Sequence, residues 1–177
     1  AAMELYIERG FEQTTVAEIA ARAGLTERTF FRHFADKREV LFAGASELQA
    51  VFVDTLTGTP LSTAPIDALA AAVHAGAAML SERREYSGLR QSVIAANPEL
   101  QERELIKLAA LAAALAVALR SRGVREPAAS LTAEAGVAVF KVGFERWIDP
   151  SNKRDFADLI QESLDELKAL TAGSAHP

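Results

Sequence analysis

Residues 15–34, TVAEIAARAGLTERTFFRHF, decide how this chain folds, because they read as two short helices joined by a tight turn. Thr15 can cap the first helix and form a capping box with the glutamate three residues later. Gly24 can take the left-handed conformation that ends a helix at little cost. Thr26 then stands where it can cap a second helix over 27–34. The stretch therefore predicts a helix-turn-helix.

The two helices are expected to have an apolar side and a polar side. Ile19, Ala20 and Ala23 of the first helix should pack against Phe30 and Phe34 of the second. The opposite side of the second helix carries arginine, threonine and glutamate. These residue types suit the edges of bases in the major groove of DNA, so the pattern favours a DNA-reading helix.

The rest of the chain also predicts helix, which gives an all-α fold of about nine helices. A long helix is expected to begin at Lys37, behind a second capping box formed by Asp36 and Glu39. We expect a DNA-binding domain over residues 1–45 and a ligand-binding and dimerisation domain over residues 46–177. The remaining helices are expected at 1–9, 37–56, 65–80, 83–96, 98–122, 127–148 and 153–170.

Composition restricts the classes of protein that the chain can belong to. The 177 residues include no cysteine, which excludes disulfides and thiolate metal sites. The longest apolar run, residues 108–119, is shorter than the ~20 residues of a membrane span, so we expect no membrane partner. No segment resembles a signal peptide, and a cytoplasmic protein is expected. His33, His74 and His176 are far apart in the sequence, and no catalytic motif is present. We therefore expect no enzyme activity, cofactor or metal site.

Net charge alone does not suggest DNA as a partner. The chain has a net charge of −5, and residues 1–45 contain six Lys and Arg against seven Asp and Glu. The placement of the basic residues is more informative, since Arg28, Arg32, His33, Lys37 and Arg38 all lie in or just after the second helix of the helix-turn-helix.

Residues 10–42, GFEQTTVAEIAARAGLTERTFFRHFADKREVLF, resemble the DNA-binding domain of the tetracycline-repressor (TetR) family. The resemblance implies a three-helix head, a larger helical body that binds a small molecule, and a homodimer that represses transcription at a palindromic operator until the effector binds. Residues 89–104, LRQSVIAANPELQERE, and 138–147, AVFKVGFERW, resemble the subgroup of mycofactocin-type regulators. That second resemblance implies an acyl-CoA-like effector.

The resemblance also implies roles for particular residues of the head. The residues that would read the groove are Glu27, Arg28, Thr29 and Arg32. Phosphate contacts are expected from Thr15, Phe31, His33 and Lys37, and Thr26 at the start of the reading helix completes the DNA-contacting set. Phe31 departs from the family pattern, because a tyrosine is common at this position.

Effector contacts are expected in the body from six residues, Phe52, His74, Arg90, Leu108, Phe140 and Phe144. Each has an ordinary structural alternative. His74 can be a hydrogen-bonded core residue, Arg90 can be a surface residue paired with Glu82 or Glu85, and the apolar residues can be plain core.

The last two expected helices, 127–148 and 153–170, each carry an apolar stripe, and we expect them to form a four-helix bundle across the two-fold axis of a homodimer. The stripes are Leu131, Ala135, Val139 and Val142 in the first, and Phe156, Ile160, Leu164, Leu167 and Leu170 in the second. The alternative is that both stripes pack within one monomer. At the level of function, the alternative is a helical DNA-binding or protein-interaction module with no small-molecule response.

Overall fold

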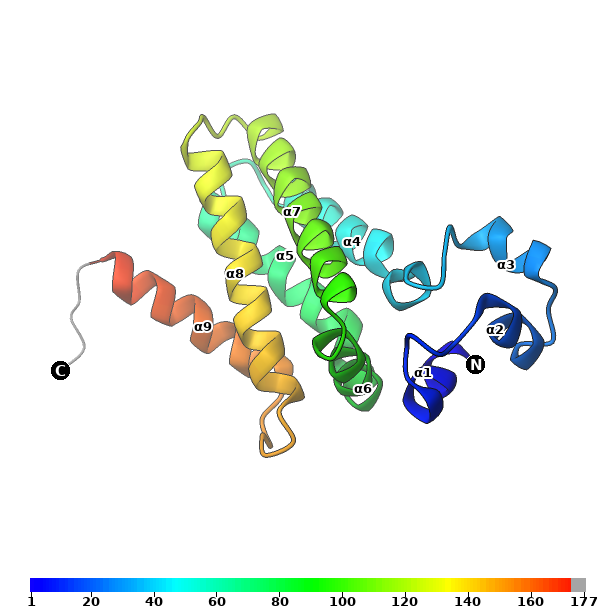
Figure 1. The fold of residues 1–177 in the computed structure, drawn as a ribbon. Helices are drawn as coiled ribbons and strands as arrows, with labels where there is room; N and C mark the ends of the chain where they lie inside the picture. Colours follow the sequence, from blue (N-terminus) through cyan, green and yellow to red (C-terminus); the bar gives the residue numbers. More distant parts are fainter. Residues whose placement is uncertain (173–177) are drawn as a thin grey trace.

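The computed structural model describes residues 1–172, and these form helices joined by short loops (Figure 1). The α-helices of the described residues are α1 (Ala2–Arg9), α2 (Val16–Arg22), α3 (Glu27–His33), α4 (Ala45–Gly58), α5 (Pro65–Leu80), α6 (Arg84–Ala95), α7 (Pro98–Ser121), α8 (Ala128–Ile148) and α9 (Phe156–Thr171). Two short 3-10 helices, Glu39–Phe42 and Ser81–Arg83, stand before α4 and α6. The predicted all-α class is confirmed. His176, the last of the three histidines, lies outside the described residues.

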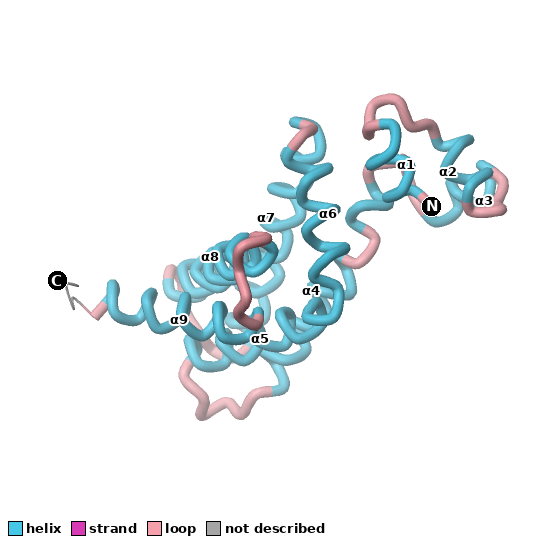
Figure 2. The backbone as a smooth tube through the Cα atoms, turned by 90° about the horizontal axis from the view of Figure 1, so that it is seen from below, coloured by secondary structure: helices cyan, strands magenta, loops and turns pink. Residues whose placement is uncertain are grey.

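The molecule has two parts that lie at opposite ends of Figure 1. Helices α1 to α3 form the head, and α4 to α9 form the body, where α9 crosses behind α8 and extends beyond it (Figures 1 and 2). The core of the body gathers side chains from five helices around Phe52, Leu69, Leu115 and Phe140. The predicted boundary at residue 45 between two domains stays a prediction.

The core of the head does not close within the head. Its buried residues include Ile19 and Phe30 from the helix-turn-helix, but also Val93, Ile94 and Leu100 from α6 and α7. The head therefore packs directly on the side of the body that α6 and the start of α7 form. Burial of apolar side chains across this contact stabilises the attachment of the head.

The predicted long helix from Lys37 is wrong. Residues Glu39–Phe42 form a 3-10 helix, and α4 begins only at Ala45. The Asp36 carboxylate does accept hydrogen bonds from the backbone N–H groups of residues 38 and 39. However, the Glu39 carboxylate turns toward α7 instead of returning to the backbone of Asp36, so no capping box forms.

By length and composition alone, residues 39–58 are apolar enough to cross a membrane. In the fold this stretch is not one continuous α-helix, because the 3-10 helix occupies its first turn. Its large side chains Phe52 and Leu56 are fully buried in the body. In all, 22% of the apolar window within this stretch is buried inside the protein.

Two of the expected helix faces need correction. Ala23 is the C-cap of α2 and is exposed, because the chain leaves the helix there through Gly24, whose φ is 69°. Val139 is buried with the core face of α8, since the helix has turned it away from the stripe of Leu131 and Val142. The stripe of α9 mostly packs within its own monomer: Phe156, Ile160 and Leu164 are buried, and only Leu170 at its end is largely exposed.

Candidate nucleic-acid interface

Two capped helices, α2 and α3, build the candidate interface. The Thr15 hydroxyl accepts a hydrogen bond from the backbone N–H of Glu18 (3.3 Å), and the Glu18 carboxylate accepts one from the backbone N–H of Thr15 (2.8 Å). The Thr26 hydroxyl accepts from the backbone N–H of Thr29 (3.2 Å) at the start of α3. The expected capping box is confirmed, and both helix starts are fixed by their own side chains.

Helix α3 is held by one side and exposed on the other. Phe30 is buried and packs against Phe34 with ring centroids 5.4 Å apart. The outward side carries Glu27, Arg28, Arg32 and His33, all exposed, and the half-buried Thr29. Phe31 is 53% exposed, and Thr15 and Thr26 are exposed as well. Apart from Thr15, which caps α2, and Lys37, the residues expected to contact DNA thus lie on α3 or at its N-cap.

Ion pairs within residues 1–45 explain how an acidic head can present a basic helix. Arg22 pairs with Glu4 and Glu8, and Arg9 pairs with Glu18. These pairs join α1 to α2 and neutralise most of the acidic side chains there. Among residues 1–172, no carboxylate lies within ion-pair distance of Arg28 or Arg32. The two arginines of α3 are therefore exposed cations without a carboxylate partner, whereas the ammonium of Lys37, which also has no carboxylate partner, is turned inward to backbone oxygens.

Lys37 does not point toward a free phosphate site, which corrects the expected role of this residue. Its ammonium donates to the backbone oxygens of Phe11 (2.8 Å), Glu12 (3.2 Å) and Thr14 (3.0 Å). It also lies 4.4 Å from the centroid of the Phe11 ring. Because an ammonium has three donors, these contacts use its full capacity. Lys37 holds the turn between α1 and α2 in place.

The backbone oxygen of Lys37 also takes part in a hydrogen bond within the head. It accepts a hydrogen bond of 2.6 Å from the Tyr6 hydroxyl. Burial raises the pKa of Tyr6 far above the ordinary value of a tyrosine, and the nearby Asp36 carboxylate adds to the effect. The hydroxyl therefore stays protonated and remains a donor at every physiological pH. The residue just after the helix-turn-helix is thus tied to α1 by both its side chain and its backbone.

Four apolar candidates for effector binding lie in or against the body core. Phe52 packs edge-on against Phe140 (5.2 Å between centroids), and Phe144 stacks near Phe140 at 6.3 Å. Phe156 and Trp147 complete this aromatic cluster, and Leu108 packs against the same core. The packing is close, because a Cβ added at Gly76 would lie 2.0 Å from the Phe52 ring.

His74 and Arg90 do not join that cluster. The His74 ring nitrogen Nε2 lies 3.1 Å from the Gln161 side chain of α9, which fits the alternative of a hydrogen-bonded structural histidine. The expected partners of Arg90, Glu82 or Glu85, are wrong. Its guanidinium instead donates to the backbone oxygen of Leu41 (2.7 Å) and pairs with Glu104 (3.2 Å). The six effector candidates are therefore not one site.

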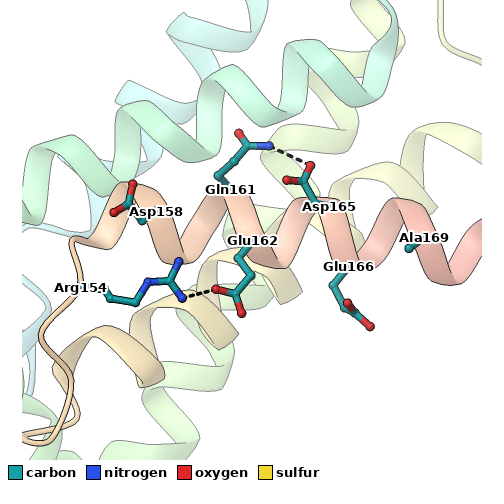
Figure 3. A pocket seen from close by; sticks show the side chains of 7 residues that line it. All are labelled: Arg154, Asp158, Gln161, Glu162, Asp165, Glu166 and Ala169. Carbon is teal, nitrogen blue, oxygen red and sulfur yellow. Dashed lines mark hydrogen bonds and ion pairs between the residues drawn. The ribbon is translucent and has the colours of Figure 1, made fainter. Parts of the chain in front are cut away.

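Two shallow hollows lie on the surface, and neither includes any of the six effector candidates. One, of about 520 Å³, follows the outer side of α9 (Figure 3). Its lining is mostly acidic and consists of Arg154, Asp158, Gln161, Glu162, Asp165, Glu166 and Ala169. The other, of about 400 Å³, lies between α1 and α6 and is lined by residues that include Ile7, Phe11 and Leu89.

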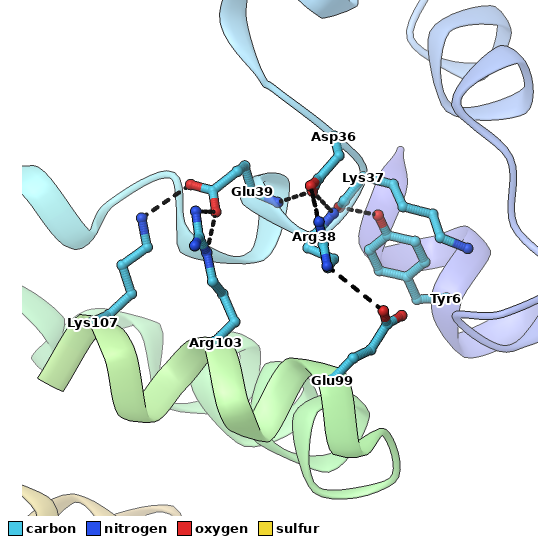
Figure 4. Close-up of polar contacts among 8 residues, drawn as sticks. All are labelled: Tyr6, Asp36, Lys37, Arg38, Glu39, Glu99, Arg103 and Lys107. Carbon is cyan, nitrogen blue, oxygen red and sulfur yellow. Dashed lines mark hydrogen bonds and ion pairs between the residues drawn. The ribbon is translucent and has the colours of Figure 1, made fainter.

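A polar network joins the segment between head and body to α7 (Figure 4). The Glu39 carboxylate accepts hydrogen bonds from Arg103 and Lys107, the second at 3.0 Å. Burial alone would raise the pKa of Glu39, but the hydrogen bonds and charges of Lys107 and Arg103 outweigh it, and the pKa lies below its ordinary value. Sequence reasoning missed this network, because its partners are more than 60 residues apart.

The described residues offer no metal site, since no group of three His, Cys, Asp or Glu side chains within 1–172 could hold an ion.

Two family models match most of the chain. Residues 1–43 match the model of bacterial regulatory proteins of the tetR family, and residues 63–172 match the model of the MftR C-terminal domain. The regulator TcmR of Streptomyces glaucescens is 39% identical over 74 residues, which are 42% of this chain and 33% of TcmR. An uncharacterized HTH-type regulator of Mycobacterium tuberculosis is 31% identical over 128 residues, 71% of this chain and 66% of that protein. The matches thus span between a third and two thirds of these relatives.

Solved structures share the fold over nearly the full chain. FadR of Bacillus halodurans, a fatty acid degradation regulator, aligns with a TM-score of 0.60 and 21% identity, covering 97% of this chain and 95% of its own. FadR of Thermus thermophilus, solved with lauroyl-CoA, aligns with a TM-score of 0.58 and 24% identity, covering 99% and 92%. At these identities the likeness shows the fold.

The position of Lys37 makes its structural role testable. Hydrogen bonds to a charged donor each stabilise by about 1.5–3 kcal/mol. We expect Lys37→Met to accelerate amide hydrogen exchange of residues 10–15 by at least about tenfold, because the turn loses its anchor. Lys153→Met, a matched change in the exposed loop before α9, should leave these amides unchanged. Unchanged exchange in Lys37→Met would contradict the anchoring role.

Proposed function

Because the chain belongs to the tetR family of bacterial regulatory proteins, we propose that it is a cytoplasmic DNA-binding regulator that represses transcription from a palindromic operator. The single observation that supports this most is the outward side of α3. There Arg28 and Arg32 are exposed and have no carboxylate partner, on a helix fixed by its own cap and by a buried phenylalanine. The side-chain contact of Arg32 is a long one, 3.4 Å to Nε2 of the exposed His33 ring. A rigid helix with free guanidinium groups is suited to bidentate contacts with guanine.

The contacts divide into two kinds. Glu27, Arg28, Thr29 and Arg32 would read bases, since they share the outward side of α3. Thr26, Phe31 and His33 would contact the phosphate backbone or pack on the sugars, which positions the helix without reading sequence. Thr15 at the start of α2 would contact a phosphate by releasing Glu18, since its hydroxyl and its backbone N–H both donate to that carboxylate. We no longer assign a phosphate contact to Lys37, because its donors are already used within the head.

The proposed assembly is a homodimer through the last two helices. On α8, Leu131 is 66% exposed and Val142 is 47% exposed, with Ala135 and Ala138 between them on the same side. An exposed apolar stripe of this kind favours a partner helix. The end of α9 extends past the body, and its Leu170 is 67% exposed (Figure 1). Two heads are needed because half-sites of a palindrome lie about 34–36 Å apart.

The proposed effector is a small apolar or acyl-CoA-like molecule. The fold neighbour from Thermus thermophilus was solved with lauroyl-CoA, which supplies a first compound to test. In this chain an acyl chain would enter among Phe52, Phe140 and Phe144. The close packing of this cluster favours a rearrangement on binding, in which the Phe52 ring moves and carries α4 with it.

The DNA-reading role predicts the effect of a single substitution. An operator is first selected from random duplexes with the purified protein, and affinities are then measured by fluorescence anisotropy at several salt concentrations. Arg28→Ala should weaken operator binding by about 1–3 kcal/mol and relax the preference at one base pair. Arg125→Ala, a change at an exposed arginine in the loop before α8, should bind as the parent does. Equal binding of the parent to all sequences would refute specific reading.

The dimer is tested by a charge in the apolar stripe. Leu131→Glu and Val142→Glu together should yield a monomer in sedimentation experiments at micromolar concentration, because carboxylates would be buried without partners. Operator affinity should then fall by at least about 100-fold, as only one half-site can be held. Leu61→Glu alters another exposed leucine and should remain dimeric. A parent that sediments as a monomer would overturn the assembly.

The effector class is tested with lauroyl-CoA itself. Binding near Phe156 should change the fluorescence of Trp147, which is the only tryptophan and stacks on Phe156 at 4.6 Å. We expect saturating lauroyl-CoA to weaken operator affinity by about 5–150-fold, a typical allosteric coupling. If neither signal changes, the acyl-CoA assignment fails. If fluorescence changes while operator affinity does not, the alternative of a DNA-binding module without a small-molecule response is supported.

A further inference from the structure

The segment between head and body, residues 35–44, is held to the body by three basic side chains. Arg103 and Lys107 of α7 bind the Glu39 carboxylate from two directions (Figure 4). Arg90 of α6 donates to the backbone oxygen of Leu41, and its guanidinium carbon lies 5.0 Å from the centroid of the Phe42 ring. We refer to Arg90, Arg103 and Lys107 as the clamp.

The clamp is more shielded from water than the other ion pairs of the chain. The side chains of Glu39 and Arg90 are 19% and 20% exposed, and the partners of Glu39 on α7 are more exposed, with Arg103 at 37% and Lys107 at 31%. By comparison, the pair of Lys168 and Asp67 on the body surface is 47% and 55% exposed. Attraction between charges is screened less where water is excluded, so the clamp constrains geometry more than a surface pair does.

The clamp residues are themselves braced. Arg90 pairs with Glu104, which directly follows Arg103 on α7 and precedes Lys107 by about one turn, and Gln91 donates to the same carboxylate at 3.1 Å. The contacts therefore join the segment, α6 and α7 into one unit. A movement of α6 or α7 would reach residues 39–42 directly, without passing through the whole of α4.

We propose that Arg90, Arg103 and Lys107 are positioning residues, which set the orientation of the head on the body. Through the hydrogen bond from Arg90 to Leu41, the clamp holds the backbone just before α4. Through Glu39, it holds the chain two residues after Lys37, whose backbone oxygen accepts the hydrogen bond from Tyr6 of α1. This inference rests on the proposed function for its consequence, namely operator binding. The fixation of residues 35–44 on the body follows from the observed contacts and does not depend on the proposed function.

The chain offers a matched control for the key residue. Arg84 lies on the same helix as Arg90 and also donates to backbone oxygens, those of Asp149 and Asn152. It holds the loop between α8 and α9 and has no contact with residues 35–44. Arg84→Met and Arg90→Met therefore each remove hydrogen bonds from a guanidinium of α6 to backbone oxygens, and only the second releases the segment that carries the head. Arg90→Met also removes the ion pair with Glu104 and the contact with the Phe42 ring.

We predict that Arg90→Met accelerates amide hydrogen exchange of residues 36–45 by about tenfold or more, whereas Arg84→Met accelerates only residues 149–153. With the operator, Arg90→Met should weaken affinity by about tenfold, since the competent orientation of the head is then populated less often. Arg90→Lys keeps the charge facing Glu104 but loses the fork that also reaches Leu41, so it should fall between parent and Arg90→Met.

The two readouts separate failure of the clamp from failure of the proposed function. If the parent does not bind DNA, hydrogen exchange alone decides on the clamp. If residues 36–45 exchange equally in the parent and in Arg90→Met, the clamp is refuted. If both arginine variants weaken operator binding to the same extent and lower the melting temperature equally, Arg90 has only a general structural role and the positioning role is refuted.

Discussion

The head is too small to bury a complete core, and the rest of the structure depends on that constraint. A three-helix unit of about 45 residues encloses little apolar volume, which leaves it marginal by itself. Here the core of the head is completed by Val93, Ile94 and Leu100 of the body. The head must therefore be docked on α6 and α7 to be stable. Because of this contact, the orientation of α3 depends directly on the positions of α6 and α7.

The charged residues of α1 and α2 also have a structural role. Glu4, Glu8 and Glu18 form ion pairs with Arg22 and Arg9 that join α1 to α2. These pairs are exposed and each contributes little stability. Two arginine charges offset part of the charge of three glutamates in these pairs, whereas Arg28 and Arg32 have no carboxylate partner among residues 1–172. An acidic chain can in this way present a basic surface at one helix.

Sequence reasoning was most successful where structure is local. The capping box at Thr15, the left-handed Gly24 and the inward Phe30 all follow from interactions within a few residues, and the structure has them. It failed where a distant partner decides the outcome. Glu39 fits a capping box by spacing, yet it is drawn to Arg103 and Lys107 more than 60 residues away. No local pattern reveals such a partner, and the same holds for Lys37 and Arg90.

The scarcity of free cations in the head affects how such a protein would find its target in a cell. Non-specific binding to DNA comes almost entirely from the neutralisation of phosphates by basic side chains. With Arg9, Arg22 and Arg38 paired to carboxylates and Lys37 turned inward to backbone oxygens, few exposed cations are left for this purpose. A chromosome offers about 10⁶–10⁹ competing sites, and weak retention there leaves a larger share of the molecules unbound. A small number of copies per cell would then be enough to keep one operator occupied.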